Sequence, residues 1–315
     1  MFGGLTALRR ALYRLRILRS VRLPVPVIVV GNVVVGGTGK TPLVIWLVDA
    51  LRRAGYVPGV ISRGYGGDAD ADVVEVMMAS RADQVGDEPL LIARRAQCPV
   101  MVGRDRVAAA RALLAAHPAV DVIVSDDGLQ HYRLQRTVEI VLFDERGGGN
   151  RWLLPAGPLR ESMSRQRDVT VLNGVQLPTG LPKNCLRMQL AGQRAEALSD
   201  RTHSISLSGL SGRIVAVAGI GNPERFFGML RAIGLSIETM ALQDHHIFSA
   251  QTFAGIAADI ILMTEKDAVK CEGIDSISND PRMWVVPVTA RIDDALITLV
   301  NDKLILEKLR GYPTA

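Results

Sequence analysis

Residues Gly31–Pro42 read GNVVVGGTGKTP and connect an apolar run, Val27–Val30, to an amphipathic segment, Thr41–Ala54, which stops before Gly55. A buried strand that leads through a glycine-rich loop into a helix is the context of a phosphate-binding loop. The glycines let backbone N–H groups converge on phosphate oxygens, and the helix N-terminus adds partial positive charge. The sequence therefore predicts a nucleotide site on a P-loop fold.

The loop departs from the usual G-x-x-x-x-G-K-[ST] pattern at one position, because Val34 stands where the first glycine belongs. Valine is tolerable there, since the glycines nearest the lysine are the ones that wrap the β-phosphate. Lys40 is predicted to reach the β- and γ-phosphates, and the Thr41 hydroxyl to hold Mg²⁺. The predicted ATP-binding residues are Val34, Val35, Gly36, Gly37, Thr38, Gly39, Lys40 and Thr41.

A second anchor for Mg²⁺ is predicted in the stretch DVIVSDDGLQH, where Asp126 and Asp127 follow an apolar run. The predicted metal residues are therefore Thr41, Asp126 and Asp127. Adjacent side chains on a strand point to opposite faces, so the two carboxylates cannot both meet the metal in the same way. Which of them contacts the ion, directly or through water, stays open at the sequence level.

Apolar runs alternate with helical patterns along most of the 315 residues. Such alternation predicts a mostly parallel sheet with helices on both faces. The pattern weakens where Pro178, Pro182 and several glycines occur, and then restarts. We therefore predict an α/β fold with a P-loop NTPase-like domain at residues 1–178, a connector at 179–205, and a smaller α/β domain at 206–315 that closes the active-site cleft.

The three cysteines are far apart and form neither a disulfide framework nor a metal pair, which fits a reducing compartment. Only six of the 37 basic residues are lysines. Arginine suits phosphate recognition, but codon bias explains such usage equally well. No stretch is apolar enough to cross a membrane, and no signal peptide is evident.

The N-terminal segment from Leu5 to Arg22 combines a leucine stripe at helical spacing with interleaved arginines, and no acid precedes Asp49. One interpretation is an ordinary amphipathic helix packed on the core. The other is a helix that lies on an anionic membrane surface. The second interpretation predicts a peripheral membrane protein without a transmembrane helix.

Seven motifs together resemble the tetraacyldisaccharide 4′-kinases, the lipid A pathway enzymes of Gram-negative bacteria. The resemblance spans nearly the whole chain, and seven motifs in order are highly specific, although TEKD or DHH alone would be weak. In sequence order the motifs are GNVVVGGTGKTP, SRGYGG (Ser62–Gly67), VGDEP (Val85–Pro89), DDGLQH (Asp126–His131), LLPAGPLRE (Leu153–Glu161), DHHIF (Asp244–Phe248) and TEKDAVK (Thr264–Lys270).

The resemblance implies ATP-dependent phosphorylation of the 4′-hydroxyl of a tetraacylated glucosamine disaccharide 1-phosphate. It implies ATP and Mg²⁺ as cofactors, a lipid acceptor as partner, and a cytoplasmic enzyme at the inner-membrane surface. It also implies two α/β domains joined by a two-stranded linker. Neither a nucleic acid nor a protein partner is implied.

Asp87 in VGDEP is the general base that the resemblance implies, paired with the histidine of DHHIF, which we place at His245. An aspartate alone is a weak base, and a nearby imidazole can accept or relay the proton. The predicted catalytic residues are therefore Asp87, His245 and Lys40. A structural alternative for Asp87 is a helix N-cap or first-turn acid before Pro89.

Two arginines are predicted to meet the negative charges of the substrates. Arg106 stands at a helix start in VGRDRVAAA, and Arg160 lies in a loop pinned by proline and glycine. Either could bind ATP phosphates, the transition state or the acceptor 1-phosphate. With little aromatic material for a sugar platform, polar groups such as Gln130 and His131 are predicted to recognise the disaccharide.

Other classes with a similar loop fail at specific residues. A GTPase would need [NT]-K-x-D, and in TEKD the lysine, Lys266, comes one position late. A partitioning-type ATPase would need lysine at Val35. A nucleotide or small-metabolite kinase remains an alternative, against which the basic N-terminus argues mildly. The turn GIGNPERF lacks the last glycine of a dinucleotide motif and is predicted to be structural.

Overall fold

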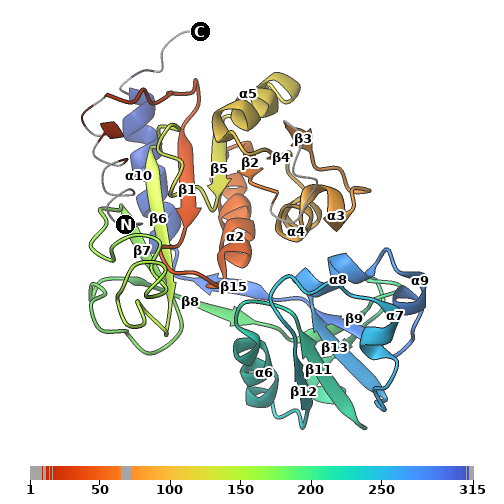
Figure 1. The fold of residues 1–315 in the computed structure, drawn as a ribbon. Helices are drawn as coiled ribbons and strands as arrows, with labels where there is room; N and C mark the ends of the chain where they lie inside the picture. Colours follow the sequence, from red (N-terminus) through yellow and green to blue (C-terminus); the bar gives the residue numbers. More distant parts are fainter. Residues whose placement is uncertain are drawn as a thin grey trace.

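The computed structural model describes residues 9, 12, 13, 15, 17–64, 73–309 and 311. Its strands form two sheets that lie side by side, one with nine strands and one with six (Figure 1). Both sheets are mostly parallel and carry helices, so the predicted α/β class is confirmed. Tyr65–Gly67 of the SRGYGG motif and most of the predicted N-terminal helix lie outside the described residues.

The larger sheet has the strand order β15-β8-β7-β6-β1-β5-β2-β4-β3. Its pairs are parallel except for the two edge pairs, β3 with β4 and β15 with β8. The carboxyl ends of β1, β5 and β6 therefore emerge together, with the phosphate loop between them. The strands are β1 (Val27–Gly31), β2 (Pro58–Ser62), β3 (Val74–Glu75), β4 (Val100–Val102), β5 (Val122–Asp126), β6 (Val138–Asp144), β7 (Val169–Asn173), β8 (Leu186–Ala191) and β15 (Thr289–Ile292).

Two apolar cores cover the faces of this sheet, because its central strands are buried on both sides. One core contains Leu43, Leu47 and Leu51, which recur on one face of the helix after the phosphate loop. The other contains Val107 and Leu113. The helices are α2 (Lys40–Arg53), α3 (Ala82–Val85), α4 (Asp87–Ala96), α5 (Arg106–Ala116) and α10 (Ala295–Leu309).

The smaller sheet has the order β10-β9-β14-β13-β11-β12, and its four neighbouring strands β14, β13, β11 and β12 are parallel. Its elements are β9 (Arg194–Ala197), β10 (Ser204–Ser206), the 3₁₀ turn η1 (Leu207–Gly209), β11 (Ile214–Ala218), α6 (Pro223–Ala232), β12 (Glu238–Ala241), α7 (Ala250–Phe253), β13 (Ile260–Thr264), α8 (Glu265–Cys271), α9 (Asp275–Ser278) and β14 (Met283–Val286).

The C-terminal helix differs from the prediction that placed residues 206–315 in the smaller domain. Leu296, Val300 and Leu304 of α10 are fully buried in the core of the larger sheet, together with α2. The strand before it, β15, pairs with β8 at the edge of that same sheet. Periodicity predicts a helix but not the core on which its apolar stripe packs.

The chain passes between the two sheets twice, once from β8 to β9 and once from β14 to β15. The predicted connector, residues 179–205, contains β8 and β9 and the first residues of β10. These strands were missed because only one side chain of β8, Met188, is buried, which leaves a weak hydrophobic pattern. The antiparallel pair β8–β15 lies where the resemblance implied a two-stranded linker.

Candidate active site

The phosphate loop is fixed by side chains from two strands. Asn32 donates from Nδ2 to the Thr38 hydroxyl (3.1 Å), and Asn173 at the end of β7 donates to the Thr38 carbonyl (2.9 Å). Gly36 and Gly39 have φ angles of 95° and 98°, a region that favours glycine. The loop thus has a defined shape before any ligand enters.

The first half of the loop packs on the segment that contains the LLPAGPLRE motif. Val34 forms an isolated bridge with Leu159, and the Val35 N–H donates to the Pro158 carbonyl (2.9 Å). Val34 is buried in the core of the larger sheet. The residue at the position of the missing glycine therefore serves packing, and the following glycines form the open part of the loop.

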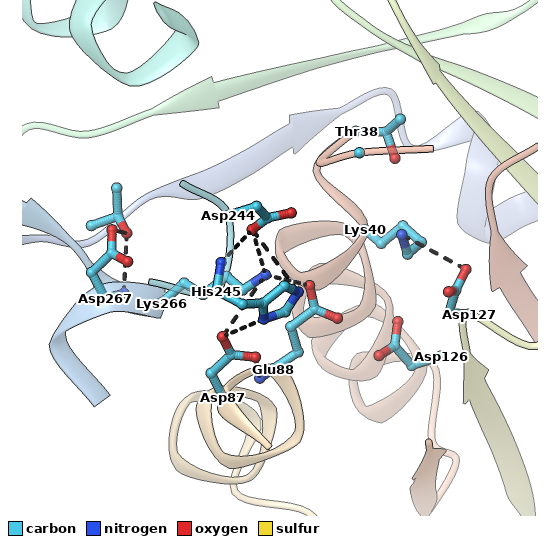
Figure 2. A network of polar contacts seen from close by, with 12 residues as sticks. Thr38, Lys40, Asp87, Glu88, Asp126, Asp127, Asp244, His245, Lys266 and Asp267 are labelled. Carbon is cyan, nitrogen blue, oxygen red and sulfur yellow. Dashed lines mark hydrogen bonds and ion pairs between the residues drawn. The ribbon is translucent and has the colours of Figure 1, made fainter. Parts of the chain in front are cut away.

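Lys40 begins α2 and points toward the end of β5 (Figure 2). Its Nζ lies 3.7 Å from Oδ1 of Asp127. Thr41 follows in the first turn of the helix and is mostly buried. A lysine and a hydroxyl at a helix N-terminus, opposite a carboxylate, are the groups that a nucleotide triphosphate and its metal ion require.

Asp126 ends β5 and is fully buried. Its Oδ2 accepts from the Ser62 hydroxyl (3.0 Å), while its Oδ1 has no hydrogen-bond partner among the described residues. Burial raises the pKa of this carboxyl to about 7, and nearby Glu88 adds to the rise while Lys40 opposes it. A carboxylate in such a position gains most from a cation.

Asp127 adopts a left-handed conformation, with φ of 47°, that turns its side chain toward Lys40 and Arg160. Arg160 donates to Oδ2 (2.9 Å), and Oδ1 has no hydrogen bond within the described part of the chain. Burial favours the neutral acid, but Lys40 and Arg160 outweigh it, so the pKa lies below its usual value. Asp127 is therefore a stable carboxylate.

These donors fit Mg²⁺, which prefers one or two carboxylates and keeps part of its water shell. Two carboxylate oxygens, one on Asp126 and one on Asp127, have no hydrogen-bond partner among the described residues. Among the described residues there is no group of three or more His, Cys, Asp or Glu side chains that could hold a metal. The residues predicted for Mg²⁺ include only two carboxylates, together with a hydroxyl, so they do not form such a group of three.

Asp87 and His245 lie beside each other across the two sheets (Figure 2). Nδ1 of His245 is 3.3 Å from Oδ2 of Asp87, which is 5% exposed. Lys266 and Lys270 place their ammonium groups 3.9 and 3.8 Å from the same oxygen. Burial raises the pKa of Asp87, but His245 and the two lysines lower it by more than burial raises it. The pKa of Asp87 is therefore below its usual value.

The local backbone explains both positions. Asp87 is the first residue of α4, and its Oδ1 accepts from the Glu88 N–H (2.8 Å). It is therefore a first-turn acid, as the structural alternative for Asp87 predicted, and its other carboxylate oxygen faces the histidine. His245 follows β12 with φ of 59°, and its N–H donates to Oδ1 of Asp244 (3.1 Å).

Lys266 is a further cation of this site that the sequence did not assign. It follows β13 in α8, and its Nζ contacts Glu88 (3.0 Å) and Asp244 (3.6 Å) as well as Asp87 (Figure 2). Burial lowers its pKa, yet the three carboxylates outweigh burial and raise it. The TEKD motif was the available signal, but its lysine was compared only with a guanine-binding lysine.

Arg106 is 1% exposed, and its only hydrogen bond within the described chain goes to the Gly103 carbonyl (2.6 Å). Burial lowers the pKa of this guanidinium to about 10, although Asp126 and Asp127 oppose the shift. The Nε and Nη2 atoms have no hydrogen-bond partner among the described residues, so they could donate to an anion.

Gln130 and His131 occupy the turn after β5. Gln130 donates to Glu161 (3.0 Å), so its amide is held in place by the LLPAGPLRE segment. Burial lowers the pKa of His131 to about 4, and the charges of Arg106 and Arg63 add to the effect. His131 is therefore neutral at pH 7 and available for hydrogen bonding.

Two cavities are lined by residues predicted for the active site. One of about 610 Å³ lies between the sheets and is lined by residues 37–42, Glu88, Lys266 and the start of α6. The other, of about 560 Å³, is lined by Asp87, His245 and Lys270. A larger cavity of about 1140 Å³ lies under residues 162–170 and touches none of the predicted site residues.

The chain was compared with protein families and with known proteins. Residues 1–305 match the model of the tetraacyldisaccharide-1-P 4′-kinase family. The chain belongs to this family. Similar proteins include the tetraacyldisaccharide 4′-kinases of Janthinobacterium sp. (strain Marseille), 62% identical over 100% of this chain and 91% of that protein, and of Dechloromonas aromatica (strain RCB), 49% identical over 100% and 92%.

A member of the tetraacyldisaccharide 4′-kinase family with a solved structure shares the fold. The "apo" form of the Aquifex aeolicus enzyme LpxK, determined in complex with ATP, matches with a TM-score of 0.78 and 26% identity over 96% of each chain. The present chain is accordingly an ATP-dependent phosphotransferase, and the 4′-hydroxyl of a lipid A precursor is its acceptor. The predicted family, reaction and cofactors are confirmed.

The described part of the chain contains no helix long and apolar enough to cross a membrane.

Proposed function

We propose that the residues around the phosphate loop divide the family's reaction among them. Lys40 and the backbone of residues 34–41 bind ATP, and Thr41, Asp126 and Asp127 hold Mg²⁺, which when bound neutralises charge on the triphosphate. The acceptor 4′-oxygen attacks the γ-phosphorus, the bond to the β–γ bridging oxygen breaks, and ADP leaves.

The contact between Asp87 and His245 is the observation that carries the assignment of the base. Asp87 takes the proton of the 4′-hydroxyl as the new P–O bond forms, and His245, at 3.3 Å, relays it. Because the pKa of Asp87 is lowered, aspartate alone holds a proton weakly, and the imidazole supplies the proton affinity that it lacks.

Arg106 and Arg160 are the proposed ligands of negative charge on the acceptor side. Nε and Nη2 of Arg106 are buried and have no hydrogen-bond partner among the described residues. A phosphate that accepts from them would therefore stabilise them more than it would stabilise the donors of an exposed arginine, which water already satisfies. Arg160 is anchored to Asp127 and lies next to the metal residues. Gln130 and neutral His131 supply hydrogen bonds to the sugar.

We further propose that the enzyme works at the cytoplasmic face of the inner membrane as a peripheral protein. Its acceptor carries acyl chains, and the described part of the N-terminal segment exposes Leu15 (70%) and Ile17 (64%) to solvent. Exposed apolar side chains beside Arg9 and Arg19 suit an anionic lipid surface better than packing on the core alone.

The test of this proposal is the product formed from labelled ATP and a purified tetraacyldisaccharide 1-phosphate. We expect label at the 4′-position and none with Lys40→Ala, because Lys40 is the loop's cation for the β- and γ-phosphates. The fold should survive, since Asp127 keeps its hydrogen bond from Arg160 (2.9 Å) when Lys40 is removed. Arg213→Ala, in an exposed pair with Glu238, is the control that should keep wild-type activity. Wild-type turnover by Lys40→Ala would remove the nucleotide site from this loop.

A further inference from the structure

Two arginines lie on the side of the phosphate loop opposite Asp126. In the sheet order, β6 and β5 flank β1, so Asp144 at the end of β6 and Asp126 at the end of β5 stand on opposite sides of the loop. Oδ2 of Asp144 is 2.7 Å from Nη2 of Arg146 and 2.7 Å from Nη2 of Arg225. One buried carboxylate thus orients two guanidinium groups.

Both guanidinium groups lie against the loop glycines. Nη1 of Arg146 is 3.2 Å from where a Cβ on Gly36 would stand, and Nη1 of Arg225 is 3.6 Å from the corresponding point on Gly39. Neither Nη1 has a hydrogen-bond partner among the described residues, and both arginines line the cavity of about 610 Å³ that contains the loop.

The nearby acidic side chains do not accept hydrogen bonds from these two Nη1 atoms. Glu145 lines the same cavity, but its carboxylate accepts from the backbone N–H groups of Val175 and Gln176. Glu224, on the first turn of α6, pairs with Arg231 on the same helix. The free Nη1 donors next to the loop therefore face the space that a polyanion bound to the loop would enter.

Arg225 comes from the other sheet. It belongs to α6, which follows β11, and the turn before it touches the loop directly, since a Cβ on Gly221 would collide with the backbone nitrogen of Gly37. The GIGNPERF turn is thus not only a structural turn of the smaller sheet. It carries an arginine to the phosphate loop of the larger one.

We infer that Arg146 and Arg225, aligned by Asp144, bind the triphosphate of ATP, and that Arg225 makes tight ATP binding depend on the smaller sheet lying against the loop. Guanidinium groups form bidentate, charge-assisted hydrogen bonds with phosphate, which lysine does not reproduce. This inference rests on the proposed assignment of residues 34–41 to ATP.

The test compares Arg225→Ala with Arg231→Ala, a substitution in an exposed pair on the same helix. Equilibrium dialysis of labelled ATP without acceptor should show affinity weakened by about 10-fold or more for Arg225→Ala, as for a lost hydrogen bond to a charged group. The KM of the lipid acceptor should stay within about 2-fold. Arg231→Ala should bind ATP like the wild type.

Arg225→Lys, which keeps the charge, should recover part of the affinity, and Arg146→Ala tests the other arginine without touching the smaller sheet. Unchanged ATP affinity in Arg225→Ala would overturn the inference. So would equal losses for ATP and acceptor with a lower Tm, which is the signature of an arginine that only joins the sheets. Lys40→Ala separates the two proposals: if it loses ATP binding while Arg225→Ala does not, the loop assignment stands and this inference fails.

Discussion

The pairing of Asp87 with His245 has a kinetic signature. We expect Asp87→Ala to lower kcat by about 10²–10⁴ with little change in ATP affinity, because a general base acts on the acceptor. His245→Ala should have a similar effect. If the two residues work as one unit across the 3.3 Å contact, the double variant should be scarcely slower than either single variant. Losses that multiply in a steady-state assay would show that the residues act separately.

Asp126 gives a prediction about stability without metal. Its folded pKa of about 7 is above its ordinary value of 3.8, so between these values the folded protein holds a proton that the unfolded chain has lost. Stability in Mg²⁺-free buffer should therefore fall as pH rises through this window. Asp126→Asn cannot ionise and should have a Tm at least about 4 °C above wild type at pH 8, with a smaller gap at pH 5.

The control for Asp126→Asn is Mg²⁺ itself. Addition of the ion at pH 8 should raise the Tm of the wild type and have little effect on the variant, because binding to the folded state stabilises it. A gap in Tm between wild type and variant that is the same at pH 5 and pH 8 would contradict the raised pKa.

At the scale of single residues, sequence reasoning reached those positions whose neighbours along the chain reveal them. Lys40 stands in a glycine-rich loop before a helix, and Asp126 and Asp127 end an apolar strand. Lys266 and Arg225 were not assigned to the site, because each reaches it only through the packing of the smaller sheet on the larger one.

At the scale of elements, the N-terminal segment carries a prediction about the membrane. Leu15, Ile17 and Leu18 are 70%, 64% and 37% exposed. Replacing all three by serine should weaken co-sedimentation with anionic vesicles and raise the KM of the lipid acceptor more than that of ATP, because apolar burial drives interfacial binding. Met77→Ser/Met78→Ser, at equally exposed positions elsewhere, is the control. Vesicle binding unaltered by the triple change would favour a helix that merely packs on its own protein.

Helices and strands with a clear hydrophobic pattern were predicted well, and strands without one were missed. The strand predicted at Val27–Val30 is observed at Val27–Gly31, and the helix predicted at Thr41–Ala54 is observed at Lys40–Arg53. The strands β8 and β9 were missed, because most of their side chains are exposed or half-buried and so lack the hydrophobic pattern that identifies buried strands. A hydrophobic pattern in the sequence indicates which side chains are buried. The strands β8 and β9 are instead held in their sheets by backbone pairing, which leaves no such pattern.

At the scale of the whole molecule, α10 binds the end of the chain to its beginning. Leu304 is fully buried beside α2, whereas Leu306 on the same helix is 54% exposed. We expect Leu304→Ala to lower the free energy of unfolding in urea by about 2–4 kcal/mol, and Leu306→Ala by less than about 0.5 kcal/mol. Equal effects of the two substitutions would mean that α10 does not dock on the larger sheet.

The interface between the sheets contains several ion pairs. Helix α4 faces α8 with Arg95 against Glu265 and Arg94 against Glu272, and Lys266 meets Glu88 close to the site. Charged contacts of this kind rearrange more readily than an apolar core, and inter-domain interfaces that are rich in them permit relative motion. The proposed catalytic pair, Asp87 and His245, spans the same interface, so its geometry depends on how the two sheets lie together.

The return of the last residues to the first sheet has a consequence for synthesis of the protein. All strands of the smaller sheet lie within residues 194–286, so this sheet is complete once that stretch has left the ribosome. The larger sheet, although it starts at Val27, lacks its edge strand β15 and the helix α10 until residues 289–309 have emerged. Until then the apolar side chains of α2 that α10 covers are exposed, so the sheet that is started first is completed after the smaller one.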